Sequence, residues 1–146
     1  MKVIQLGEKF NEKYDFRETC FGIVKRGNKM LVVNKQGQYS LIGGGIEKGE
    51  SFEECLKREF LEESGYHISK IRELIRIDCY WLAANKYPML SKANIFEVEV
   101  SLDNIDRPLE NDCKSEWIDV NSSLDLLPLP YHKEAVKYYM QKKDFN

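Results

Sequence analysis

The feature that most constrains the fold is a helix whose ends are marked and whose apolar stripe becomes acidic part-way along. Ser51 and Glu54 have the spacing of a capping box, in which each side chain bonds to the backbone N–H of the other residue. Gly65 suits the position after the last helical turn, where the backbone takes a positive φ. Together these signals predict a helix over about 52–64.

The apolar residues of this helix gather on one side. With an advance of about 100° per residue, Phe52, Cys55 and Leu56 form a stripe that faces the core. Glu59 and Glu63 occupy the next positions of the same stripe, where a core-facing helix would carry more apolar residues. The sequence therefore directs carboxylates toward the side of the helix that its own apolar residues bury.

A third glutamate joins the two acids of the stripe. Glu62 follows Glu59 by three residues and Glu63 follows it by four, so the carboxylates lie on neighbouring faces, about 5–6 Å apart at Cβ. Burying an unpaired carboxylate costs several kcal/mol, and a divalent cation between the acids would offset that cost. Mg²⁺ suits such a site because it prefers oxygen ligands. The alternative is a solvated acidic face balanced by Lys57 and Arg58.

The helix is part of a longer pattern. Residues 44–66, GGIEKGESFEECLKREFLEESGY, resemble the Nudix box: Gly, five residues, Glu, seven residues, Arg-Glu, an apolar residue, any residue, Glu-Glu, any residue, Gly and an apolar residue. The matching positions are Gly44, Glu50, Arg58, Glu59, Phe60, Glu62, Glu63, Gly65 and Tyr66. The resemblance implies the fold of that family, a Nudix-type α/β/α sandwich, which is an α/β domain with a mixed sheet.

The resemblance also implies an activity, the hydrolysis of a nucleoside diphosphate linked to another moiety. The favoured substrate is a (deoxy)nucleoside triphosphate, cleaved to the monophosphate and pyrophosphate, with Mg²⁺ as cofactor and Mn²⁺ as a possible substitute. The alternative substrates are ADP-ribose, a nucleotide-sugar or a dinucleoside polyphosphate. A different class of function also stays open, namely a Nudix-like domain that senses a nucleotide without cleaving it.

The metal ligands follow from the same resemblance. By analogy Glu59 and Glu63 bind the cation directly, and Glu62 binds it directly or through water. A backbone carbonyl at Gly43 or Gly44 completes the set. Water then attacks one phosphorus atom, while the cations neutralise charge on the leaving phosphate.

Two further catalytic roles are implied less specifically. Arg58 would orient the glutamates, paired with Glu50, where the alternative is an ordinary surface ion pair. The resemblance leaves the general base open between an acid of the box and an acid on a distant loop. The candidates are Glu62, Glu110, Asp112 and Glu116.

Four residues outside the box are candidates for substrate binding. Lys35, at the end of a strand, and Arg17, before the first core strand, are candidate phosphate contacts, although both are also ordinary surface cations. Tyr80 and Trp81 lie where the chain leaves a strand and are candidates for stacking on a nucleobase, the alternative being a place in the core. Ile42 stands where many relatives have proline, which removes a fixed φ but leaves the glycine carbonyls available.

The remaining pattern predicts a sheet with helices packed on it. TCFGIVKRGNKMLVVNKQGQYSLI reads as two β-rich runs around a turn at Gly27-Asn28, and GGGIEKGE as a glycine-rich loop. Other predicted elements are strands over 71–81, 93–101 and 115–120, a polar linker over 82–92, and helices over 122–127 and 131–143. Tyr131, Ala135, Val136 and Tyr139 have core-facing spacing, and His67 and His132 are expected to be structural.

Composition narrows the class of protein. A chain of 146 residues is most simply one domain, 1–146. A net charge of −2 and a pI near 5.8 argue against a nucleic-acid polymer as partner and fit a small-molecule nucleotide. No segment reads as a secretion signal or a membrane span, and the four cysteines form no C-x-x-C pair, so we expect a reduced, cytoplasmic protein. Whether it is a monomer or a homodimer stays open.

Overall fold

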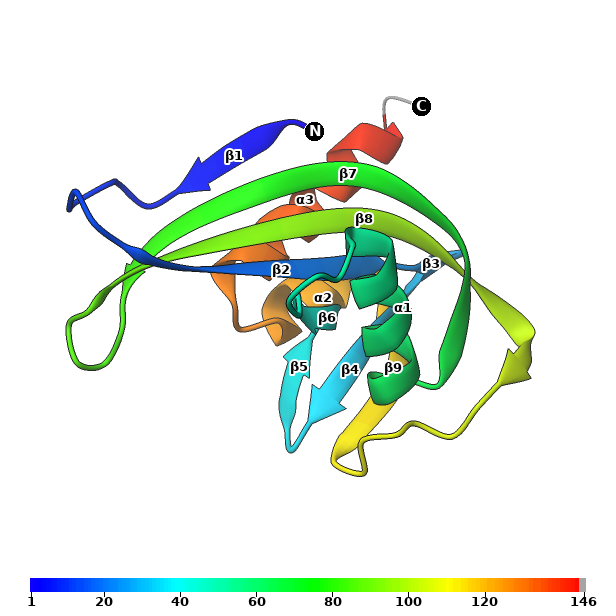
Figure 1. The fold of residues 1–146 in the computed structure, drawn as a ribbon. Helices are drawn as coiled ribbons and strands as arrows, with labels where there is room; N and C mark the ends of the chain where they lie inside the picture. The colour runs from blue at the N-terminus through cyan, green and yellow to red at the C-terminus, as the bar shows by residue number, and fades with distance from the viewer. Residues whose placement is uncertain (145–146) are drawn as a thin grey trace.

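The computed structural model describes residues 1–144, and a five-stranded mixed sheet forms its centre (Figure 1). The strands in spatial order are β1 (Val3–Leu6), β7 (Tyr66–Leu82), β8 (Pro88–Ile105), β2 (Asp15–Ile23) and β6 (Ile42–Gly45). β1 and β7 run parallel to each other, as do β2 and β8, whereas the pairs β7–β8 and β2–β6 are antiparallel. β6 is therefore an edge strand, with β2 as its neighbour.

A smaller antiparallel sheet packs beside the first. β4 lies at its centre and pairs with each of the other strands. The strands are β3 (Lys25–Arg26), β4 (Lys29–Lys35), β5 (Gln38–Ser40) and β9 (Cys113–Asp119). The predicted turn at Gly27-Asn28 joins β3 to β4, but the hairpin is short because β2 belongs to the other sheet and the chain crosses over at Val24.

Helices cover both faces of the central sheet (Figure 1). α1 (Phe52–Glu63) packs on one face with a core that includes Cys20, Cys55 and Phe60. α2 (Val120–Leu126) and α3 (Pro130–Asp144) pack on the other, in a second core. This arrangement confirms the α/β/α sandwich. The predicted core stripe of α3 is also confirmed, since Ala135, Val136 and Tyr139 are buried and Tyr131 packs against them.

The predicted ends of α1 are confirmed. The Ser51 hydroxyl accepts a hydrogen bond from the Glu54 N–H, and the Glu54 carboxylate accepts one from the Ser51 N–H, both at 3.1 Å. After the last turn Gly65 has φ 77°, which suits glycine. A side chain there would also meet the carbonyl of Asp106, so the same glycine lets the 106–113 loop lie against the end of the helix.

Two local predictions need correction, and one strand had no predicted counterpart. The predicted loop GGGIEKGE begins as a strand, because the three glycines belong to β6 and pair with residues of β2. The linker predicted over 82–92 is much shorter, since β7 runs to Leu82 and β8 starts at Pro88. Proline is tolerated there because it is the first residue of its strand. β1 was not predicted at all.

The long β7–β8 hairpin and the start of β2 form an arm that projects beyond the helices, at the left of Figure 1. Its polar residues are exposed on an extension of the sheet, which is why the sequence there reads as a linker. Within residues 1–144, no helix has the length and apolar character needed to cross a membrane.

Candidate functional site

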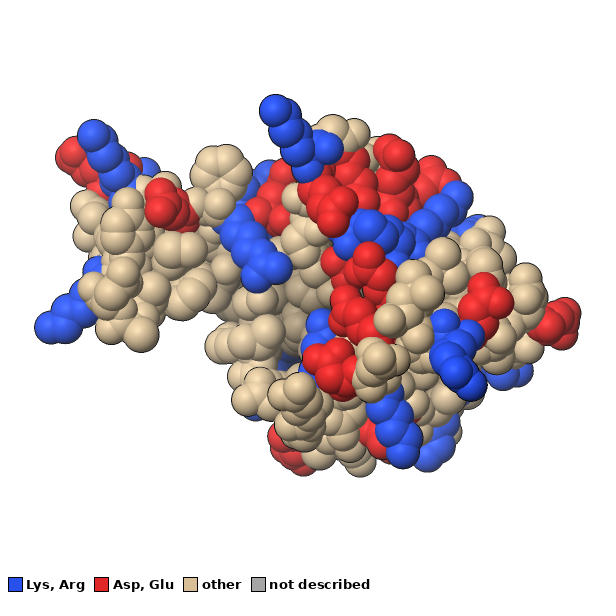
Figure 2. Space-filling view, turned by 60° about the horizontal axis from the view of Figure 1, so that its bottom comes forward, with Lys and Arg blue, Asp and Glu red and all other residues tan. Residues whose placement is uncertain are grey.

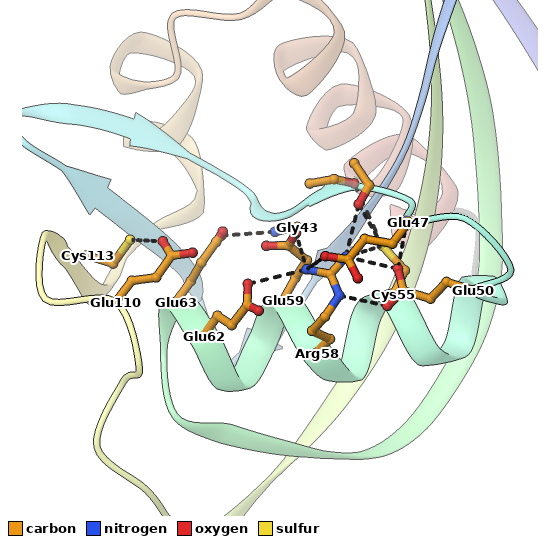
Figure 3. Close-up of polar contacts among 12 residues, drawn as sticks. Gly43, Glu47, Glu50, Cys55, Arg58, Glu59, Glu62, Glu63, Glu110 and Cys113 are labelled. Carbon is orange, nitrogen blue, oxygen red and sulfur yellow. Dashed lines mark hydrogen bonds and ion pairs between the residues drawn. The ribbon is translucent and has the colours of Figure 1, made fainter.

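Three glutamates of α1 lie together beneath the glycine strand β6, and we call Glu59, Glu62 and Glu63 the acid cluster (Figure 3). Glu59 and Glu63 are buried and Glu62 is half-buried. Glu59 and Glu63 extend the buried stripe of Cys55 and Leu56, as the helical spacing predicted. One face of the molecule carries a band of acidic side chains, with Lys and Arg beside it (Figure 2).

Arg58 holds the open side of this cluster. Its Nε and Nη2 donate to the two carboxylate oxygens of Glu50, at 2.7 and 2.9 Å. Nη1 donates to Glu59 at 2.9 Å and to Glu62 at 3.3 Å, and Nη2 also donates to the carbonyl of Gly45 at 3.0 Å. The bond from Arg58 lowers the pKa of Glu50 to about 2, and Glu50 in turn raises the pKa of Arg58. Arg58 thus joins the acids to the edge strand.

Glu63 is the most enclosed of the acids, with a side chain that is 0% exposed. The Gly43 N–H donates to its Oε1 at 3.2 Å, and Nζ of Lys35 forms an ion pair with its Oε2 at 3.0 Å, although Oε2 accepts no well-aligned hydrogen bond. Burial raises the pKa of Glu63 to about 8, against the opposing charge of Lys35. Burial acts to lower the pKa of Lys35, but the charge of Glu63, the bond to it and the nearby Cys113 and Glu110 together raise that pKa.

These residues fit a divalent cation. Burial and the charge of Glu59 raise the pKa of Glu62, so the acids repel one another in the absence of a cation. A Cβ at Gly44 would lie 2.6 Å from Oε1 of Glu59, so glycine is what allows the backbone of β6 to approach the carboxylates this closely. Clustered carboxylate oxygens beside a backbone strand are the donors that Mg²⁺ prefers.

The 106–113 loop brings another acid to the end of the cluster. The Glu110 N–H donates to the carbonyl of Glu62 at 2.9 Å, and the Glu110 carboxylate accepts from the Cys113 thiol at 3.1 Å (Figure 3). Burial and that bond raise the pKa of Cys113 to about 12, so the thiol keeps its proton. Asp112 is exposed on the same loop, and oxygen or sulfur atoms of Glu110, Asp112 and Cys113 lie within 4.8 Å of one another.

The third loop candidate for a base lies elsewhere. Glu116 belongs to β9 and bonds to the Tyr39 hydroxyl, which raises the pKa of Tyr39. Alternation along β9 points Glu116 away from the side occupied by Cys113 and Trp117. Of the three loop acids, the structure therefore brings Glu110 nearest to the acid cluster.

A cavity of about 520 Å³ lies on the face of the central sheet that carries α3, between the arm and the start of that helix. Its walls are mainly apolar and include Trp81, Met89 and Tyr131, with Arg17 and Thr19 beside them. Thr19 pairs with Gly45 across β2 and β6, so the cavity lies beside the end of the glycine strand.

The four predicted substrate contacts divide between three places. Arg17 lies at the cavity and against the edge strand, where a Cβ on Gly45 would be 3.2 Å from its Nη2. Trp81 is in the cavity wall, whereas Tyr80 points to the opposite face of β7 and packs on Tyr14, with ring centroids 5.0 Å apart. Lys35 is at the acid cluster. Tyr80 therefore lies neither at the cavity nor at the acid cluster.

Several cavity residues escaped the sequence reasoning. Thr19, Cys79 and Ser91 contribute to the lining from three neighbouring strands, and Leu129 closes it from the residue before α3. The signal for them is the period of two in a strand, which places Cys79 and Trp81 on one face, and likewise Met89 and Ser91. Met89 and Ser91, however, lie in the segment predicted as a linker.

The two histidines occupy structural positions. His132 is fully buried, with Nδ1 accepting from the Leu41 N–H at 3.4 Å and its ring packed on Phe21. Burial lowers its pKa to about 3. His67 is partly exposed, with Nε2 2.6 Å from Asp106.

Comparison with known proteins places most of the chain in one family model. The model described as NUDIX domain matches residues 16–141. The ADP-ribose pyrophosphatase of Methanocaldococcus jannaschii is 30% identical over 132 residues, covering 84% of this chain and 72% of that protein. The NAD-capped RNA hydrolase NudC of Vibrio parahaemolyticus is 38% identical over 53 residues, and this match spans only 20% of NudC.

Solved structures share the fold. A MutT protein from Bacillus halodurans superposes with a TM-score of 0.69 at 22% identity, covering 83% of this chain and 80% of that one. At this identity the likeness concerns the fold alone.

Proposed function

We propose, from the premise that this chain belongs to the NUDIX domain family, that it is a pyrophosphohydrolase that uses Mg²⁺ to cleave the diphosphate of a nucleotide derivative. The observation that carries this proposal is the acid cluster, in which Glu63 is fully enclosed and Arg58 ties Glu59 and Glu62 to β6. An enclosed carboxylate group of this kind is costly without a cation.

The metal would be held by oxygen atoms alone. Glu59 and Glu63 would bind it directly, Glu62 directly or through water, with a carbonyl of Gly43 or Gly44. When bound, Mg²⁺ supplies Lewis-acid polarisation of phosphate oxygens and lowers the pKa of water, and Mn²⁺ can substitute for it. The buried position of Glu63 excludes bulk water from one side of the site, which strengthens each electrostatic contact.

The cationic residues would position the phosphates. Arg58 keeps the carboxylates oriented through its fork to Glu50. Lys35, which is 40% exposed at its side chain, can turn from Glu63 toward an incoming phosphate. Arg17 lies at the cavity and next to Gly45 of β6. A diphosphate that reaches from the cavity past β6 to the acid cluster would therefore meet Arg17 at one end and Lys35 at the other.

Two acids compete for the role of general base. Glu62 is half-buried, and burial and the charge of Glu59 raise its pKa, which makes its carboxylate a stronger base. Glu110 lies next to it through the loop contact at the Glu62 carbonyl. The variants Glu62→Gln and Glu110→Gln distinguish the two candidates. Replacing the residue that acts as the base should cause the larger loss of kcat and should change the pH dependence of kcat.

The cavity would take the base of the substrate. Its apolar walls suit an aromatic ring, and Trp81 offers a face for stacking, worth about 1–3 kcal/mol per base. A nucleoside triphosphate is the first candidate, because its leaving pyrophosphate needs no second pocket. ADP-ribose is the second candidate, supported by the similarity to the Methanocaldococcus jannaschii enzyme over most of both chains.

A panel of substrates tests this function. Purified protein with Mg²⁺ is given nucleoside triphosphates, ADP-ribose, nucleotide-sugars and diadenosine polyphosphates, and the products are separated by ion-exchange chromatography. Turnover that disappears with EDTA and in Glu63→Gln supports the proposal. Tight binding of a nucleotide without any turnover would instead support a sensing domain.

We also propose that the protein works in a reducing, cytoplasmic setting, as a monomer or homodimer. All four cysteines are free thiols in the structure, and Cys20 and Cys55 are fully buried. Fractionation of cells with an antibody to the protein, followed by size-exclusion chromatography, tests both points.

A further inference from the structure

We infer that Ser91 is a specificity-determining residue, which orients Trp81 and donates a hydrogen bond to an acceptor atom on the base of the substrate. This inference rests on the proposed function, in that the cavity holds the base. It adds to that function a rule about which bases are accepted.

Ser91 lies in the middle of the cavity floor. On β8 it is the cross-strand partner of Cys79 on β7 and of Arg17 on β2, and all three line the cavity. Ser91 is only 9% exposed, so a ligand group that reaches its side chain is shielded from water. Hydrogen bonds made at such a position discriminate more strongly than those at the rim.

The contact with Trp81 fixes the direction of one bond. Nε1 of Trp81 lies 2.9 Å from Oγ of Ser91. An indole N–H can only donate, so the serine oxygen is the acceptor. Trp81 itself is 43% exposed, and this bond anchors an indole that would otherwise be free to rotate at the cavity mouth. A stacking face held in place before the ligand arrives loses less entropy on binding.

The hydroxyl hydrogen of Ser91 is left for the ligand. Among residues 1–144, the Ser91 hydroxyl donates to no protein acceptor, whereas the Thr19 hydroxyl already donates to the carbonyl of Lys92 at 3.5 Å. Donation from Trp81 also polarises the Ser91 hydroxyl and makes it a better donor. A base that presents a ring nitrogen or carbonyl oxygen here completes the chain of bonds.

A base that presents C–H at this point leaves a buried donor unpaired. A site that donates a buried hydrogen bond rejects ligands that lack the acceptor, because the donor remains unpaired only when such a ligand is bound. Ser91 should therefore select among bases by the position of their acceptors.

The test uses the best substrate of the panel and analogues in which one ring nitrogen at a time is replaced by C–H. For the wild type we expect one analogue to lose about 5- to 10-fold in kcat/KM, mainly through KM. Ser91→Ala should lose a similar factor on the parent substrate and no longer distinguish that analogue. Cys79→Ala, the cross-strand neighbour, is the volume control, and its effect should be the same for every analogue.

Trp81→Phe completes a double-mutant cycle. If Ser91 acts partly through Trp81, the double variant should lose less than the product of the two single losses. Fluorine NMR of protein labelled with fluorotryptophan gives a readout independent of activity, since the Trp81 signal should shift and broaden in Ser91→Ala while that of Trp117 stays unchanged.

The inference is overturned if Ser91→Ala hydrolyses all analogues with one common factor, or if the Trp81 signal does not move. Either result leaves the proposed hydrolase intact. Absence of any nucleotide hydrolysis with Mg²⁺ would instead overturn the proposed function and this inference with it.

Discussion

Lys35 Nζ lies 3.0 Å from Oε2 of Glu63, so the most deeply enclosed acid of the site has a half-exposed lysine as its counter-charge. One lysine does not offset the burial of Glu63, whose pKa remains raised to about 8. The site is therefore electrostatically incomplete without a further cation, and this imbalance gives rise to several predictions.

Glu63→Gln should make the metal-free protein more stable at high pH while abolishing activity. The folded-state pKa of Glu63 is raised, so its stabilising, protonated form is fully present below pH 4.5 and is lost as the pH rises through 8. Glutamine mimics the protonated form at every pH. Thermal unfolding in EDTA should show a higher Tm for the variant at pH 9 and little difference at pH 4, whereas kcat with Mg²⁺ should fall at least about 100-fold. A variant with lower Tm at pH 9 would contradict this.

Lys35→Gln should shift the activity profile to higher pH. Without the ammonium, less charge opposes the burial of Glu63, so its pKa rises further and the acid ionises only at a higher pH. Because a cation competes with that proton, the apparent affinity for Mg²⁺ at pH 7 should fall and recover as the pH is raised. Lys57→Gln, which removes an exposed lysine paired with Glu53 on α1, is the control. An unchanged profile in Lys35→Gln would exclude this coupling.

Arg58→Lys should lower kcat by about 10- to 100-fold with the fold retained. Lysine keeps the charge but cannot make the fork to Glu50 and also reach Glu59 and Glu62. The carboxylates then lose their fixed orientation. Steady-state kinetics and circular dichroism check the two parts, and wild-type kcat in this variant would show that the fork has no catalytic role.

His132 should make the protein sensitive to acid. Its pKa is lowered to about 3 in the folded state, so the stability that it contributes is present above pH 6.5 and is lost as the pH falls toward 3. The loss is at most about 1.4 kcal/mol per pH unit. Urea unfolding between pH 7 and 4 should show a shallower decline for His132→Gln than for the wild type.

The sequence predicts the acid cluster better than the rest of the site. The capping box and the position of Glu59 and Glu63 on the apolar stripe depend on local spacing, and the structure has both. The pairing of Arg58 with Glu50 lies within the same motif. Such features depend on one helix and the loop before it, so periodicity and cap chemistry determine them.

The cavity depends on contacts that spacing does not encode. Its lining comes from three strands and the start of α3, and the register that sets Ser91 beside both Cys79 and Arg17 is a property of the whole sheet. The arm extends past the helices, so its strands lack the alternation of a half-buried sheet and read as a linker. Tyr80 and Trp81, adjacent in sequence, point to opposite faces because side chains alternate along a strand.

The most direct test of the central claim is a calorimetric titration of Mg²⁺, and then Mn²⁺, into the metal-free protein at pH 8, with and without a non-hydrolysable nucleotide. Uptake of cation by the wild type, tightened by the nucleotide and lost in Glu63→Gln, is the expected result. If neither ion binds under either condition, or if Glu63→Gln binds as the wild type does, then the acids of α1 do not form a metal site.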